Sequence, residues 1–201
     1  MTGPFYFLDF SADNDWYFAE TAAYSPDDLL TLSLEGDSLA DIGVSIGLPK
    51  ARGRLIEHLS VVPLTMILRD DVIAVLQHHD AHVEAFPVKV DRATDARYWF
   101  ANIVGHVEAV DNDASGVTYG IPGIRVYSHV AHLRLDGAAV GDRHVFRLST
   151  LRTHVVVSDD VRQALQALPD VTSMRFVPCD GFVYPVPMQW NEVIDDDGRL
   201  R

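Results

Sequence analysis

Three histidines, His78, His79 and His82, lie close together in the sequence. His78 and His82 are four residues apart, and on a helix this spacing places two imidazoles on one face, as a helical metal site requires. The glutamate of an HExxH motif is absent, and no third ligand lies nearby. Because the C-terminal end of a helix also favours histidine electrostatically, we expect the cluster to be structural and to bind no metal.

A second group of polar residues runs from Asp111 to Gly116 and resembles the start of a calcium-binding loop. Oxygen-bearing side chains stand at its first, third and fifth places, with glycine at the sixth, but the twelfth place holds Pro122 where a bidentate glutamate is required. We therefore interpret the segment as a turn that ends a strand. Asp111, Ser115 and the earlier Asn102 are expected to satisfy backbone groups there.

The motifs of common enzyme classes are absent from the sequence. It contains no G-x-S-x-G elbow, P-loop or G-x-G-x-x-G segment, and its single cysteine, Cys179, lies in a turn-like Val-Pro-Cys-Asp-Gly context. We therefore expect no catalytic residues and no cofactor. The alternative is a small metal-dependent hydrolase that uses the His78/His82 face together with Asp111 or Asp113.

The pattern of apolar residues predicts the elements that position these groups. Residues 70–82 have helical spacing, and Ser158 is the expected N-cap of a second helix. Residues 97–115 are predicted to form one long strand that ends in the acidic turn. Residues 83–90 are predicted to form an edge strand because they contain Pro87. Further strands are expected at residues 5–10, 16–18, 124–135, 144–148, 154–157 and 174–177. Clustered strands favour an α+β fold with a mainly antiparallel sheet and two or three helices.

Charge is distributed unevenly along the 201 residues. The net charge is −13, and residues 1–49 hold nine acids and no Lys or Arg, whereas the rest of the chain is close to neutral. A surface with this excess of negative charge repels nucleic acid and anionic membranes and attracts basic partners. The amino terminus lacks the basic and apolar regions of a secretory signal, and no segment has the length of a membrane span, so we expect a cytoplasmic protein.

Several segments, in this order, resemble the Imm11 immunity family, also described as a domain of unknown function numbered 1629. The resemblance covers about Arg54 to Phe182. Its segments are Pro63 to Asp71, the Tyr-Trp-Phe-Ala-Asn-Ile-Val strand at 98–104, the Asp-Asn-Asp-Ala-Ser turn at 111–115, Phe-Arg-Leu at 146–148, Val-Val-Val-Ser-Asp at 155–159, and Met-Arg-Phe-Val at 174–177.

The resemblance implies a bacterial polymorphic-toxin immunity protein, a non-enzymatic binder that neutralises the toxin encoded beside it. It predicts a main domain at residues 50–182, preceded by an acidic extension at 1–49 that packs on it and followed by a tail at 183–201. The extension lies outside the shared region, so we expect it to contact a cognate toxin that is itself basic. The expected contact residues are Asp13, Asp15, Trp16, Asp27 and Asp28.

Overall fold

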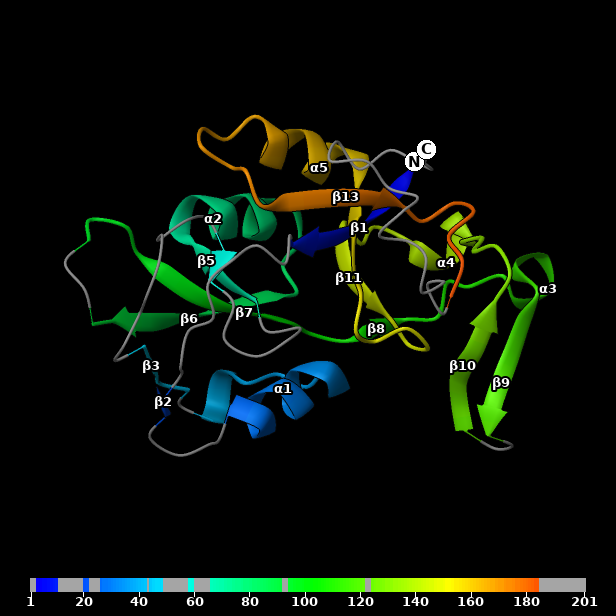
Figure 1. The fold of residues 1–201 in the computed structure, drawn as a ribbon, viewed down its shortest axis with the longest axis horizontal. Helices are drawn as coiled ribbons and strands as arrows, with labels where there is room; N and C mark the ends of the chain where they lie inside the picture. Colours follow the sequence, from blue (N-terminus) through cyan, green and yellow to red (C-terminus); the bar gives the residue numbers. More distant parts are fainter. Residues whose placement is uncertain are drawn as a thin grey trace.

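The structure, a computed structural model, describes residues 3–10, 20–21, 26–42, 44–48, 58–59, 66–91, 94–121 and 124–184. Two sheets and a separate hairpin form its framework (Figure 1). The five-stranded sheet contains, in spatial order, β13 (Met174–Pro178), β1 (Phe5–Phe10), β12 (Val155–Ser158), β11 (Val145–Leu148) and β8 (His106–Val107). The six-stranded sheet contains β2 (Glu20–Thr21), β3 (Ile46–Leu48), β6 (Val83–Val90), β7 (Tyr98–Ile103), β5 (Ile67–Arg69) and β4 (His58–Leu59). The hairpin is formed by β9 (Val117–Ile121) and β10 (Ile124–Val130).

The helices differ in length. Three have eight to ten residues, namely α1 (Pro26–Glu35), α2 (Asp70–His79) and α5 (Asp159–Gln166). The others are the short α3 (Asn112–Ser115) and α4 (Gly137–Val140) and the 3-10 turn η1 (Ala40–Ile42). Most strand pairs are antiparallel, and β3/β6 and β8/β11 are parallel. The predicted α+β class with mainly antiparallel sheets is confirmed.

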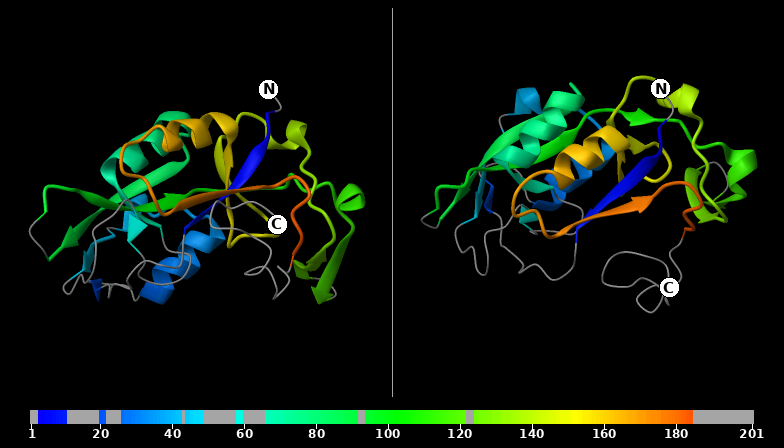
Figure 2. Two further views of the ribbon diagram at one scale, coloured as in Figure 1. Left: turned by 45° about the horizontal axis from the view of Figure 1, so that its top comes forward. Right: turned by 90° about the horizontal axis from the view of Figure 1, so that it is seen from above.

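The helices cover the sheets from different sides. Helices α2 and α5 lie side by side, as Figure 2 shows, and α1 lies on the opposite side of the six-stranded sheet from α2. The core beneath α2 and α5 joins both sheets, and its buried members include Val72, Leu76, Val161, Leu165, Leu68, Ile103, Val145 and Val157. A second core on the other face of the five-stranded sheet includes Phe7, Phe146, Val156, Leu133 and Phe182. Burial of these apolar side chains is the main force that holds the layers together.

The predicted long strand at residues 97–115 is wrong in one respect, because the chain is interrupted after β7. Gly105 has a φ of +76°, which side chains other than glycine rarely adopt, and its N–H donates to the Gly36 carbonyl at 2.7 Å. The chain then enters β8 and pairs with β11 in the other sheet. Residues 104–105 are therefore the point at which the chain passes between the two sheets.

The predicted edge position of β6 is also wrong. β6 pairs with β7 on one side and with β3 on the other. Pro87 is compatible with this position because β3 pairs only with Val88 to Val90, so the proline lies just before the doubly paired part of the strand.

The acidic N-terminal quarter contributes directly to the sheets. β1 lies between β12 and β13, and Phe7 and Leu8 are buried, which confirms the strand predicted at 5–10. β3 adds a strand to the other sheet. The strand predicted at 16–18 lies outside the described residues, and the domain boundaries at 49 and 182 stay predictions. Within the described ranges, none of the helices combines the length and apolar character that crossing a membrane would need.

Candidate functional site

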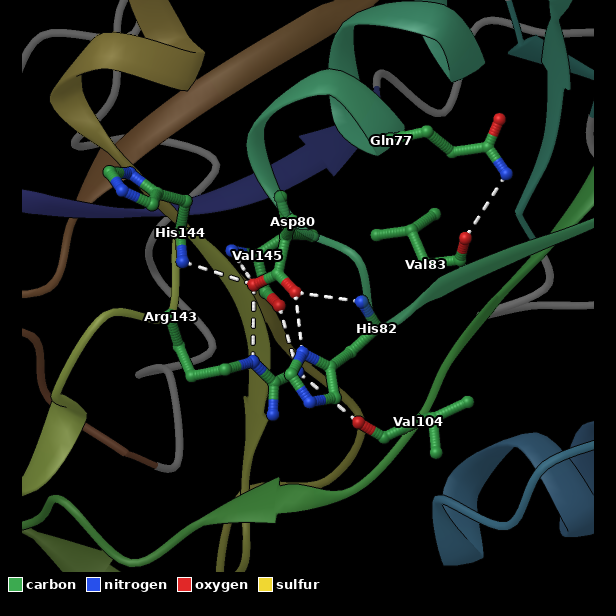
Figure 3. A network of polar contacts seen from close by, with 8 residues as sticks. All are labelled: Gln77, Asp80, His82, Val83, Val104, Arg143, His144 and Val145. Carbon is green, nitrogen blue, oxygen red and sulfur yellow. Dashed lines mark hydrogen bonds and ion pairs between the residues drawn. The ribbon is translucent and has the colours of Figure 1, made fainter.

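The most densely bonded side chain in the described part of the molecule is the carboxylate of Asp80, just after α2 (Figure 3). Oδ1 accepts hydrogen bonds from the backbone N–H and from Nδ1 of His82, both at 2.9 Å. Oδ2 accepts from Nε of Arg143 at 3.1 Å and from the backbone N–H groups of His144 and Val145, both at 3.0 Å. Only 2% of the Asp80 side chain is exposed, so this is a buried and fully hydrogen-bonded ion pair with Arg143.

The Asp80 network connects the ends of four elements. Asp80 is the extended C-cap of α2, and its N–H still donates to the Leu76 carbonyl. Arg143 extends the network through Nη2, which donates to the carbonyls of Val104 and Val145 at 3.2 and 3.1 Å. The carboxylate therefore joins the end of α2, the approach to β6, the crossing between the sheets and the start of β11.

The environment of Asp80 stabilises its charged form. Burial alone raises the pKa of this carboxyl, but the hydrogen bonds from Val145 and His82 and the charge of Arg143 lower it to about 2. Both oxygens are already saturated with donors. A carboxylate held in this way is suited to fixing the fold and poorly suited to accepting a proton as a general base near neutral pH.

The predicted helical His78/His82 face is wrong, because α2 ends at His79 and His82 lies in the following turn, where it bonds to Asp80. The cluster that does form joins His78, His79 and His144. The His79 ring centroid lies 5.2 Å from that of His78 and 6.0 Å from that of His144. Burial, followed by the neighbouring His78 and His144, lowers the pKa of His79.

The chemistry of the hydrolase alternative is not assembled in the described part of the chain. No three His, Cys, Asp or Glu side chains converge there in a way that could hold a metal ion. Asp111 and Asp113 belong to the α3 region beside the hairpin, on the far side of the molecule from α2 (Figure 1). The buried Cys179 has its pKa raised by burial, so its thiolate, the nucleophilic form, is disfavoured.

The turn at 111–116 is a single turn of helix, and its side chains bond to the backbone as predicted. Asp111 is the N-cap of α3, with Oδ1 accepting from the Ala114 N–H at 3.0 Å. The buried Ser115 hydroxyl accepts from the N–H of Arg134 at 2.9 Å and donates to its carbonyl at 3.3 Å. Gly116 ends the helix in the left-handed conformation.

We expect Asp111→Ala to lower the free energy of unfolding by about 1 kcal/mol, because an N-cap hydrogen bond is lost. Urea unfolding measures the change. Asp113→Asn, at an exposed position in the same helical turn, is the control and should change stability little. An Asp111→Ala protein with wild-type stability would show that this cap contributes little to the fold.

A second polar network fixes the segment that follows α1 to the sheet. Glu84 on β6 accepts from the Ser38 hydroxyl and, at 2.8 Å, from the Leu39 N–H. The fully buried Asn102 on β7 donates through Nδ2 to Glu84 and to the Asp37 carbonyl, both at 2.9 Å. Burial raises the pKa of Glu84, but the hydrogen bonds from Ser38, Leu39 and Asn102 outweigh it and leave the pKa below its ordinary value.

The structure places the predicted partner-binding residues only in part. Asp13, Asp15 and Trp16 lie outside the described residues, and Asp27 is in α1, where its side chain is not described. Asp28 is exposed on the same helix. Three further acids of this region, Glu35, Asp37 and Asp41, are also exposed.

Sequence reasoning missed Asp80, Glu84 and Arg143 as organising residues. Asp80 carries a weak local signal, since an aspartate directly after a helix and before a strand is a common turn residue. Nothing near Glu84 or Arg143 in the sequence indicates their partners, which are 45 and 63 residues away.

Comparison with known families relates the chain to an immunity protein family. A family described as "Immunity protein family (Imm11)" matches residues 75–181, which is slightly more than half of the chain. The matched range contains Asp80, Glu84, Asn102 and Arg143, whereas α1 precedes it. No curated protein matches the chain.

Proposed function

We propose that this chain, which belongs to the Imm11 immunity protein family, is a non-enzymatic protein that binds and neutralises a cognate bacterial toxin. Its place of action would be the cytoplasm of the cell that makes the toxin. The family as a whole implies a toxin as partner. The finer proposal is that the acidic N-terminal quarter forms much of the contact surface and that the toxin is basic.

The observation that carries this proposal is the charge of residues 1–49, nine acids without a single Lys or Arg. Four of these acids, Asp28, Glu35, Asp37 and Asp41, are exposed on or just after α1. A concentrated negative potential raises the rate at which a basic protein is encountered.

The attachment of this region to the sheet supports the same proposal. The Glu84 and Asn102 network holds the backbone of residues 37–39, so the segment after α1 is fixed to strands inside the family-matched range. A fixed surface loses less conformational entropy on binding than a free one. Strands inside the family-matched range would thus hold the proposed acidic surface in place.

The test uses the purified toxin encoded beside this protein and a variant with Asp13→Asn, Asp15→Asn, Asp27→Asn and Asp28→Asn. We expect the association rate constant at low salt to fall about tenfold or more, and its salt dependence to weaken, because electrostatic steering is lost. Stopped-flow fluorescence measures both. Trp16→Ala is expected to act mainly on the dissociation rate, since buried aromatic anchors hold a complex together.

A matched control carries the same change of charge elsewhere. Asp91→Asn, Asp95→Asn, Asp113→Asn and Asp142→Asn remove four exposed acids outside the N-terminal quarter. An equal fall in rate for both variants would mean that only net charge matters. Unchanged rates in the first variant, with its fold intact, would place the binding surface elsewhere.

A further inference from the structure

Three side chains near the end of β11, one buried and two half-buried, have buried polar atoms without a hydrogen-bond partner. These atoms are Nε of Arg147, Nε2 of His106 and Oγ1 of Thr150. Arg147 is only 1% exposed, and in the described part of the chain its hydrogen bonding is limited to Nη1, which donates to the Arg152 carbonyl at 2.8 Å. Buried polar atoms without a partner are uncommon in folded proteins, so three in one neighbourhood require a physical explanation.

The two basic side chains lie next to each other on neighbouring strands. Arg147 on β11 and His106 on β8 are in register in a parallel pair, so their side chains leave the same face of the sheet. Thr150 and Arg152 belong to the turn that follows β11. The parallel pair therefore places a guanidinium and an imidazole side by side.

This position has an excess of positive charge. Burial lowers the pKa of Arg147 to about 10, which still leaves the guanidinium charged at neutral pH. No carboxylate among the described residues forms an ion pair with it. Burial and the charges of Arg152 and Arg147 lower the pKa of His106, whereas a hydrogen bond to the Leu34 backbone and the charge of Asp37 act in the opposite direction. A buried charge without a counter-charge is costly, and a bound anion would remove that cost.

We propose that Arg147 and His106 form a binding site for a small oxyanion, of the carboxylate or phosphate type. The Nε edge of a guanidinium presents donors in a fork that matches two oxygens of such an anion, and Nε is the atom left without a partner here. His106 supplies a further donor for the remaining oxygens when its imidazole is protonated. The Gly36 turn lies close to the imidazole, since a Cβ at Gly36 would lie 3.0 Å from Cε1 of His106.

The experiment measures thermal unfolding in increasing phosphate, sulfate or acetate, with sodium chloride added to keep the ionic strength constant. For the wild-type protein we expect the Tm to rise with the logarithm of the concentration of at least one of these anions, as ligand binding to the folded state requires. The phosphate and acetate series distinguish a tetrahedral from a planar anion. Arg147→Met should abolish the rise, whereas Arg175→Met, at an exposed position on β13, should retain it.

A second variant keeps the test decisive if Arg147→Met does not fold. Arg147→Lys preserves the charge but loses the fork, and we expect it to bind the anion about tenfold more weakly in isothermal titration calorimetry. The proposal is overturned if no anion raises the wild-type Tm, or if wild type and the folded Arg147 variants respond equally.

Discussion

Asp80→Asn is expected to lower the free energy of unfolding by about 3–5 kcal/mol, the range found when one partner of a buried ion pair is removed. The Asp80 side chain is 2% exposed and its partner Arg143 is 12% exposed, so water can replace the lost interactions only poorly. The asparagine NH₂ group would also face backbone N–H groups that now donate to the carboxylate. The two effects add. The first leaves the charge of Arg143 unpaired, and the second places the asparagine NH₂ donors against backbone N–H donors.

Urea unfolding followed by circular dichroism measures the loss, provided that the transition is two-state. Asp142→Asn, at an exposed aspartate near the same network, is the matched control and should change stability little. Arg143→Met should cost less than Asp80→Asn, because Asp80 would still accept hydrogen bonds from His82, His144 and Val145. A loss below about 1 kcal/mol for Asp80→Asn would show that the network contributes little to stability.

Acid is expected to destabilise the wild-type protein more than the Asp80→Asn variant. The pKa of Asp80 is about 2 in the folded protein against an ordinary value of 3.8. Because the folded-state pKa is the lower one, ionised Asp80 stabilises the folded protein. This contribution to the free energy of unfolding is fully present above pH 3.8 and is lost as the pH falls toward 2. The difference between the two pKa values of Asp80 corresponds to about 2 kcal/mol in the free energy of unfolding.

The measurement is the free energy of unfolding of both proteins between about pH 6 and pH 2. The wild-type curve should fall more steeply below pH 4, so that the two curves approach each other in acid. Asp71 and Glu84 also have lowered pKa values, so the variant should retain part of the acid sensitivity. Parallel curves for the two proteins would contradict the assignment of a low pKa to Asp80.

The local elements were predictable because their signals lie within a few residues. Ser158 caps α5 by accepting from the Val161 N–H, as expected from a serine before two aspartates and an apolar stripe. The start of α2 at Asp70 and the α+β class follow from the same kind of short-range pattern. The family resemblance, drawn from the order of short segments, agrees with the Imm11 match over residues 75–181.

The sequence alone therefore determined the class of fold, most element positions, the acidic character of the first 49 residues and the family. Only the tertiary structure decided where α2 ends, where the strand after Asn102 breaks, and which side chains organise the molecule. Asp80 and Val145 are 65 residues apart, and Asn102 and Asp37 are also 65 apart. Helix caps and apolar periodicity depend on residues that are neighbours in the chain. The hydrogen-bond partner of a buried carboxylate or amide depends instead on how distant elements pack. Each such group needs a hydrogen bond in whatever surroundings the fold gives it.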